Sequence, residues 1–220
     1  MNKVIITGST GMVGQGVLLE CLDSTKIEKV LVINRNSLDM QHPKLDEVLL
    51  KDFQQIDNEK EKLKGYDACF HCMGVSSVGK TEEQYHELTF DISKSLVDVC
   101  YEVNPSMVFN YVSGEGTDSS EKGNTMWARV KGKTENYILN KGFADAYMFR
   151  PGAIIPEKGI KSKTSLYNTI YVILRPFFGL LKKLKNITTT TKMGQAMINT
   201  LSAQQALKHL ENKDINKLAQ

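Results

Sequence analysis

The stretch Lys3 to Cys21, KVIITGSTGMVGQGVLLEC, decides the fold of this chain. Its apolar run Val4–Ile6 is typical of a buried strand, and apolar residues then recur at helical spacing as far as Cys21. Between the two segments lies a turn that carries three spaced glycines. Strand, glycine turn and helix in this order predict the first unit of an α/β fold.

The glycine turn has the composition of a site for the pyrophosphate of a dinucleotide. We expect Gly8 to let the chain reverse, Gly11 to let the ligand touch the backbone, and Gly14 to let the helix pack close to the strand. The N–H groups of the first helical turn would then face the phosphates. The residues expected to shape the site are Gly8, Ser9, Thr10, Gly11, Met12, Val13 and Gly14. A tight turn without a ligand is the alternative, because spaced glycines also occur by chance.

Composition limits the class of protein. The chain has 220 residues, of which 41% are hydrophobic and 24% charged, so we expect one globular domain over residues 1–220. The net charge is only +3 and the basic residues are spread along the chain, which argues against a nucleic-acid partner. Met1 and Asn2 lead directly into the first strand, so we expect a cytoplasmic protein.

Strand and helix patterns alternate along most of the chain. This alternation predicts a doubly wound parallel sheet of the Rossmann type, an α/β fold with right-handed crossovers and helices on both faces. Residues 151–220 are expected to add a small cap on the substrate side.

The segment after the second strand, Lys29–Ile33, bears on the choice of dinucleotide. An acidic residue at this point holds the ribose 2′-hydroxyl of NAD, whereas an arginine accommodates the 2′-phosphate of NADP. Here Arg35 follows the strand and no carboxylate occurs before Asp39. The sequence therefore favours NADP(H) over NAD(H), with a solvated surface arginine as the alternative.

Later strand ends add residues to the same predicted site, because ligands of open α/β sheets bind at the carboxyl ends of the strands. Asp52 and Phe53 follow a short third strand and are expected to flank the adenine. Gly74 and Val75 follow the fourth strand and are expected to line the middle of the cofactor.

Cysteine and histidine do not point to a metal site. Cys69 and Cys72 have redox or zinc spacing, but they fall on a predicted strand, where residues three apart face opposite sides. We expect buried thiols there. Histidines 42, 71, 86 and 209 show no ligand spacing and are interpreted as structural.

Several motifs together resemble one superfamily. They are TGSTGMVG near the start, Asn34-Arg35, CMGVSS after the fourth strand, YVSGEG after the fifth, helical WARVKGKTE, Arg150-Pro151-Gly152 and the late Leu210–Lys213. In order and spacing the chain resembles the atypical short-chain dehydrogenase/reductase superfamily, and within it Tat-interacting-protein-like and NmrA-like proteins. The similarity covers essentially the whole chain.

The resemblance implies a catalytic serine, followed by a tyrosine and a lysine four residues apart. Ser113 falls on the serine position and Lys131 on the lysine position, where the ammonium also binds the nicotinamide ribose; Pro151 lies at the nicotinamide end. The tyrosine position holds Trp127, whose indole cannot act as a general acid or base. Tyr137 and Lys141 repeat the spacing, but they lie too far along the helix to replace the missing pair. For Lys131, the alternative is an exposed helix lysine.

The stretch Leu166–Leu181 is strongly apolar, has 16 residues and includes Arg175-Pro176; three lysines follow within the next four residues, so that the whole segment covers 166–185. It is too short and too broken to span a bilayer. We favour a lid over a substrate pocket, and peripheral contact with a membrane surface is the alternative. A β-type run, Ile187–Thr190, follows it, and Thr191 is expected to cap the next helix.

Two functions fit these residues. The first is an oxidoreductase or epimerase-like enzyme acting on a small carbonyl or hydroxyl compound, with Ser113, a water molecule or a substrate group supplying the proton. The second is a non-catalytic NADPH-binding redox sensor that acts through a protein partner. A membrane-peripheral assembly subunit is a third and weaker hypothesis.

Overall fold

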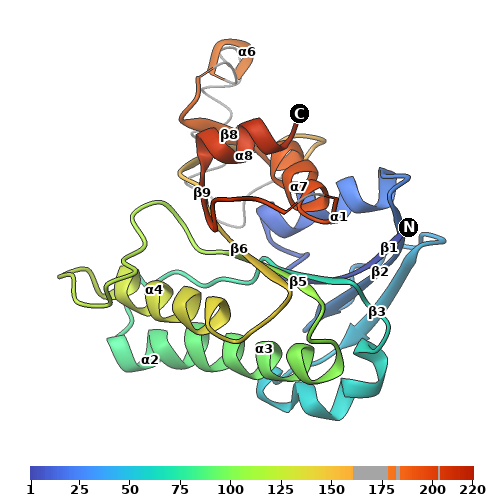
Figure 1. The fold of residues 1–220 in the computed structure, drawn as a ribbon, viewed down its shortest axis with the longest axis horizontal. Helices are drawn as coiled ribbons and strands as arrows, with labels where there is room; N and C mark the ends of the chain where they lie inside the picture. The colour runs from blue at the N-terminus through green and yellow to red at the C-terminus, as the bar shows by residue number, and fades with distance from the viewer. Residues whose placement is uncertain (161–177, 182–183, 203) are drawn as a thin grey trace.

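The computed structural model describes residues 1–160, 178–181, 184–202 and 204–220 (Figure 1). Its main sheet is parallel throughout, in the order β3-β2-β1-β4-β5-β6-β9. The strands are β1 (Asn2–Thr7), β2 (Ile27–Asn34), β3 (Leu45–Leu49), β4 (Ala68–His71), β5 (Val108–Val112), β6 (Asp145–Arg150) and β9 (His209–Glu211). The predicted α/β fold with a doubly wound parallel sheet is confirmed.

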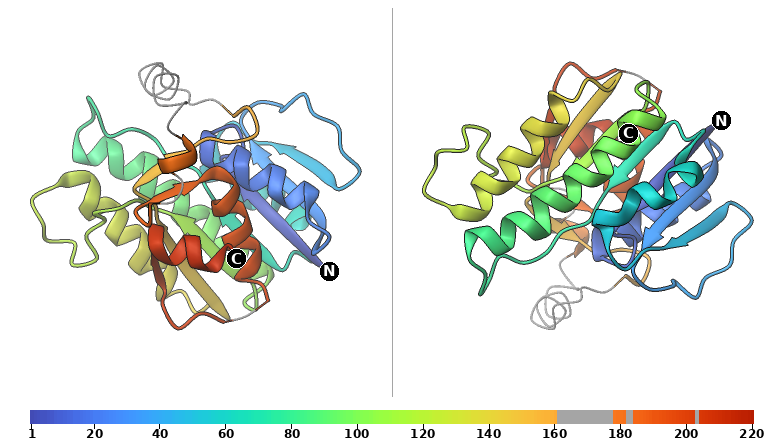
Figure 2. Two further views of the ribbon diagram at one scale, coloured as in Figure 1. Left: turned by 90° about the horizontal axis from the view of Figure 1, so that it is seen from above. Right: turned by 90° about the horizontal axis from the view of Figure 1, so that it is seen from below.

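Helices cover both faces of this sheet, as Figures 1 and 2 show. One face carries α1 (Met12–Asp23), α7 (Thr190–Asn199) and α8 (Asn212–Leu218). The other carries η1 (Phe53–Leu63), α2 (Glu82–His86), η2 (Glu87–Asp91), α3 (Ile92–Val103) and α4 (Met126–Leu139). Because both faces are covered, the strands read as continuous apolar runs.

Successive residues of each strand enter opposite halves of the core. Val4 and Ile6 pack toward α1 and α7, whereas Ile5 packs toward η1 and α3. The same alternation separates Cys69, which lies in the second half, from Cys72, which packs against the first. Both are free thiols whose side chains enter different layers. Cys69 is buried as predicted, whereas Cys72 follows the end of β4 and is only half-buried.

The helix after β4 begins at a capping threonine, Thr81. Thr81 Oγ1 accepts from Gln84 N at 3.3 Å and the Gln84 side chain accepts from Thr81 N, which completes a capping box. A π-helical turn, η2, then shifts the register of the apolar face. Leu88 is consequently 40% exposed although simple helical periodicity buries it.

The C-terminal part contributes both to the main sheet and beside it. β7 (Ala153–Ile155) and β8 (Ile187–Thr189) form a second, two-stranded parallel sheet, and β9 pairs with β6. The N-cap of α7 is Thr189, whose Oγ1 accepts from Lys192 N at 3.1 Å. The prediction of Thr191 as the cap is wrong because the helix begins immediately after β8, within a run of threonines that all have capping hydroxyls.

The predicted lid or membrane-surface segment, 166–185, falls largely outside the described residues, which include only α6 (Phe178–Leu181) and residues 184 and 185 of it. In the part of the chain that the structure describes, no helix combines the length and apolar character that crossing a membrane requires.

Candidate functional site

The strand order changes direction between β1 and β4, since β2 and β3 lie on one side of this pair and β5 and β6 on the other. Open α/β sheets bind their ligands at such a switch point, outside the carboxyl ends of the strands. A cavity of about 120 Å³ lies there. Its lining residues are Gly8, Thr10, Gly11, Ile33, Asn34, Arg35, Phe53, Cys72, Met73 and Gly74.

The glycine turn leaves no room for side chains. Gly8 has φ +74°, and a Cβ added to it would lie 2.7 Å from the backbone of Cys72. A Cβ on Gly14 would lie 2.3 Å from the carbonyl oxygen of Gly8. Gly11 is the N-cap of α1 and offers no side-chain cap to the first turn. A bare backbone cradle at the start of a twelve-residue helix fits the pyrophosphate of a nicotinamide dinucleotide.

The other residues of the turn differ in their placement. Ser9 is fully buried, and its Oγ donates to Asn34 Oδ1 at 2.9 Å, which ties the turn to the end of β2. Thr10 lines the cavity. Met12 and Val13 belong to the first turn of α1, and Val13 packs against the core beneath it.

At the end of β2, Arg35 is exposed and lines the cavity. The nearby loop is held by Glu47 of β3, whose carboxylate accepts from Asn34 Nδ2 at 3.2 Å, Ser37 Oγ at 2.7 Å and Leu38 N at 3.1 Å. Sequence reasoning missed the roles of Asn34 and Glu47, because they depend on the register between β2 and β3.

Phe53 is buried and lines the cavity, whereas Asp52 Oδ1 accepts from Gln54 N at 3.0 Å and caps η1. Gly74 also lines the cavity, and no atom lies within 4 Å of a Cβ built on it. Val75 instead packs against the cluster of Tyr85, Phe90 and Val130.

Ser113 and Lys131 meet at the carboxyl end of β5. Lys131 Nζ donates to the backbone oxygen of Ser113. Burial lowers the pKa of Lys131 to about 8, and the Glu135 carboxylate opposes this effect. Pro151 is buried beside them at the end of β6, where its carbonyl oxygen accepts from Glu115 N at 3.0 Å.

A buried ion pair behind Ser113 was not anticipated from the sequence. Ser113 Oγ donates to Glu135 Oε1 at 2.5 Å, and Arg150 Nε donates to the same oxygen at 3.0 Å. Glu135 is fully buried. The spacing of Lys131 and Glu135, one helical turn apart, was the available sign that both side chains reach the same strand end.

Trp127 lies where the resemblance implies a tyrosine, and its side chain has no ionisable group. Its partly buried ring packs against Tyr85, Phe90 and Val130. The rejected alternative, Tyr137 with Lys141, lies elsewhere: the Tyr137 hydroxyl and Lys141 Nζ both donate to the carboxylate of Asp98 on α3.

His71, at the end of β4, has a fixed tautomer. Ser93 Oγ donates to the carbonyl oxygen of Thr89, so it accepts from His71 Nε2 at 2.9 Å. His71 Nδ1 then accepts from Thr7 Oγ1 at 2.6 Å. Burial, aided by the charge of Lys131, lowers the pKa of His71 to about 3. The ring is therefore a neutral structural link between β1, β4 and α3. Among the described residues, no three histidine, cysteine or carboxylate side chains gather as a metal site.

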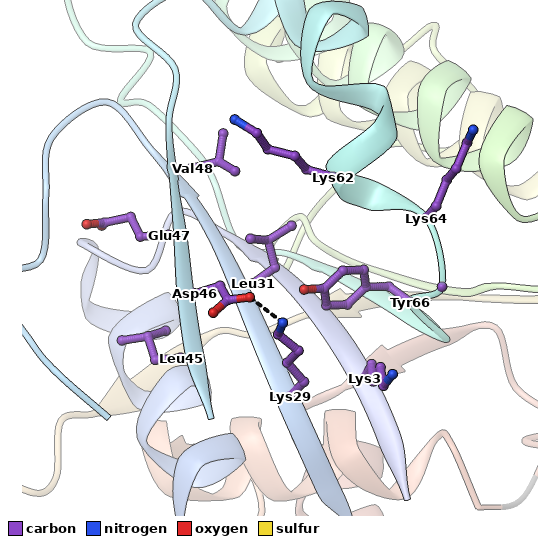
Figure 3. A pocket seen from close by; sticks show the side chains of 11 residues that line it. Lys3, Lys29, Leu31, Leu45, Asp46, Glu47, Val48, Lys62, Lys64 and Tyr66 are labelled. Atoms are coloured by element: carbon purple, nitrogen blue, oxygen red, sulfur yellow. Dashed lines mark ion pairs between the residues drawn. The ribbon is translucent and has the colours of Figure 1, made fainter. Parts of the chain in front are cut away.

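A larger hollow, about 630 Å³, lies toward the amino ends of β1, β2 and β3 (Figure 3). Lysines border the hollow, and two of them form ion pairs with carboxylates: Lys29 with Asp46 at 2.5 Å, and Lys64 with Glu61 at 2.6 Å. This hollow is on the edge of the sheet opposite the glycine turn.

Comparison with known proteins agrees with this geometry. Residues 4–150 match the model of the NAD dependent epimerase/dehydratase family. The chain belongs to this family. The resemblance to short-chain dehydrogenases/reductases and an NAD(P)-binding Rossmann fold are thereby confirmed.

Solved structures share the fold. Gre2 of Candida albicans in complex with NADPH superimposes with a TM-score of 0.70 at 15% identity, over 96% of this chain and 77% of Gre2. WbmH of Bordetella bronchiseptica in complex with NAD+ gives 0.67 at 16% identity, over 92% and 72%. These two structures hold NADPH and NAD+ respectively, so a nicotinamide dinucleotide cofactor is supported.

The curated relatives correct one prediction. Protein FMP52 of Meyerozyma guilliermondii is 22% identical over 71% of this chain and 66% of its own length, and it is named as mitochondrial. The relatives from Emericella nidulans and Candida albicans carry the same designation. The expected cytoplasmic location is contradicted, because a strand near residue 1 is a property of the fold and carries no information about compartment.

Proposed function

We propose that this chain is an NADP(H)-dependent oxidoreductase or epimerase-like enzyme of the atypical short-chain type, acting on a small carbonyl or hydroxyl compound. The observation that carries the proposal is the bare glycine cradle at the switch point, with Arg35 at its rim and Lys131 at the end of β5. When bound, the dinucleotide supplies or accepts a hydride.

The preference for NADP(H) rests on charge at the end of β2. Arg35 lines the cavity, and no carboxylate pairs with it in the described ranges. Glu47, the acid that reaches this loop, is occupied by three hydrogen bonds. Arginine forms charge-assisted bonds to phosphate, so a 2′-phosphate finds a partner here.

In this proposal each of the remaining residues would contact a different part of the cofactor. The turn from Gly8 to Gly14 would hold the pyrophosphate. Phe53, with Asp52 behind it, would flank the adenine. Gly74 and Val75 would line the middle of the dinucleotide, and Ser113, Lys131 and Pro151 would surround the nicotinamide.

Calorimetry with NADPH and NADH tests the preference. Arg35→Ala should weaken NADPH binding by about tenfold to a hundredfold, the value of a charge-assisted hydrogen bond, and should barely change NADH binding. Lys64→Ala removes one positive charge at the opposite edge of the sheet and is the matched control (Figure 3). Equal losses for both nucleotides would remove Arg35 from the 2′-phosphate site.

The second candidate function is a redox sensor that binds NADPH without turnover and acts through a protein partner. Trp127 favours it, because the indole N–H can donate a hydrogen bond but does not ionise, so it cannot act as a general acid or base. NADPH oxidation with a panel of aldehydes and ketones separates the two functions. Turnover by the wild type supports the enzyme, whereas binding without turnover, with activity appearing in Trp127→Tyr, supports the sensor.

A further inference from the structure

Lys131 lies at the carboxyl end of β5. Its Nζ donates to the carbonyl oxygen of Ser113 at the end of β5, and its charge adds to the effect of burial in lowering the pKa of His71 at the end of β4. A Cβ on Gly114 would lie 3.9 Å from Nζ. The ammonium therefore lies at the carboxyl end of β5.

The hydroxyl of Ser113 is not free to donate to a ligand. Its one proton is directed to Glu135 Oε1 at 2.5 Å, and this carboxylate is fixed by Arg150. The backbone of Ser113 is fixed as well, since its N donates to Phe149 O at 2.8 Å. In this arrangement Ser113 can accept a hydrogen bond through Oγ but cannot supply a proton.

The tyrosines that the structure describes do not supply one either. Tyr85 and Tyr111 are buried, and burial raises the pKa of both hydroxyls. The remaining hydroxyls lie at other places: Tyr66 at the hollow of Figure 3, Tyr101 beside Gly142, Tyr137 on Asp98 and Tyr147 on Asp145.

We propose that Lys131 itself is the proton donor and acceptor of the reaction, in place of the tyrosine that Trp127 replaces. This inference rests on the proposed function. In reduction, the carbonyl carbon receives the hydride and the carbonyl oxygen receives a proton from Lys131 Nζ, which becomes a neutral amine and is reprotonated from water. The product is the alcohol, and the reverse reaction returns the proton to Nζ.

The surroundings of Lys131 suit this role. A lysine pKa of about 8 lies close enough to neutral pH for both protonation states to be used. The groups that face it are Glu135 on its own helix, whose negative charge favours the ammonium, and the neutral ring of His71 on β4. Glu135 and Ser113 act as positioning residues. The carbonyl oxygen of Ser113 accepts a hydrogen bond from Lys131 Nζ, and Glu135 fixes the side chain of Ser113.

The first test measures protonation without turnover. The chain is labelled with ¹³C at lysine Cε, titrated by NMR with and without NADPH, and Lys131 is assigned by its absence in Lys131→Arg. A midpoint near pH 8 supports the proposal. A midpoint above pH 10 in the presence of NADPH overturns it, whatever the substrate.

The second test uses activity on the carbonyl panel. Arginine keeps the positive charge but holds its proton below pH 12, so Lys131→Arg should bind NADPH as the wild type does and lose about 100-fold or more in kcat. Lys133→Arg, two residues along on an exposed part of α4, is the control and should keep the wild-type rate.

The outcomes separate this inference from the proposed function. Absence of NADPH binding by the wild type contradicts the proposed function. If the wild type binds NADPH and turns over, and Lys131→Arg keeps the wild-type rate, then Lys131 is not the proton donor. The proposed function would stand in that case. In the wild type, kcat for reduction should fall about tenfold per pH unit above pH 8, since only the ammonium can donate; a profile flat to pH 10 also counts against Lys131.

Discussion

Lys131 and Glu135 lie one turn apart on α4 and bind the same residue of β5, the ammonium through the carbonyl oxygen of Ser113 and the carboxylate through its hydroxyl. Ser113 is thus held from two sides by one helix. Arg150 at the end of β6 completes the arrangement by pairing with Glu135. The placement of Ser113 at this edge therefore depends on a buried ion pair between α4 and β6.

Glu135→Gln should destabilise the fold by about 3–5 kcal/mol, because it leaves the largely buried guanidinium of Arg150 without its counter-charge. Urea unfolding measures this change. The double variant Glu135→Gln/Arg150→Met removes both charges and should recover part of the loss. If the single variant unfolds at the wild-type urea concentration, the pair contributes no stability.

The same substitution should move the titration of Lys131. The Glu135 carboxylate favours the charged lysine, so its removal lowers the pKa of Lys131 below about 8. The ¹³C titration should show the midpoint moving to lower pH in Glu135→Gln. An unchanged midpoint would mean that the two side chains do not interact through their charges.

Gly14→Ala should prevent close packing of α1 on the turn. The added methyl would lie 2.3 Å from the Gly8 carbonyl oxygen, a backbone atom that cannot move aside, so we expect a loss of about 3 kcal/mol or more in the free energy of unfolding. Gly74→Ala is the control, because its methyl meets open space and should leave stability unchanged. It should still weaken NADPH binding, since Gly74 lines the cavity. Equal stability of the two variants would contradict the packing argument.

Much of this architecture could be predicted because it depends on local pattern. The apolar run before Gly8 and the glycine spacing each specify a conformation within a few residues. The parts of the site that depend on the register between distant segments could not be predicted from the sequence. Glu47 of β3 accepts from Asn34 of the neighbouring strand β2, and Glu135 of α4 accepts from Arg150 of β6.

The structure differs from the sequence pattern in two further places, each with a specific physical cause. The π-helical turn at Glu87–Asp91 inserts a register shift that an unbroken period of 3.6 does not contain, which exposes Leu88. β9 is three residues long and has no apolar run of its own, so the sequence did not indicate that a strand pairs with β6 at this edge of the sheet.

Tyr137→Phe should leave NADPH binding and turnover unchanged. The hydroxyl donates to Asp98 of α3, together with Lys141, so its loss removes one hydrogen bond and about 1 kcal/mol of stability. Steady-state kinetics and urea unfolding of this variant check both parts. A large drop in kcat would restore Tyr137 and Lys141 as the catalytic pair, against their distance from Ser113 along α4.

His71 should make stability depend on pH below neutrality. Its pKa is about 3 in the folded chain and near 6.5 when unfolded, so the unfolded state binds a proton first as the pH falls. The stabilising contribution is complete above pH 6.5 and is lost toward pH 3, at about 1.4 kcal/mol per pH unit. His71→Gln has a side chain that cannot be protonated in this range. The difference between wild type and His71→Gln in the free energy of unfolding should therefore shift by this slope between pH 6 and pH 5, whereas a constant difference would mean that His71 is accessible to protons in the folded state.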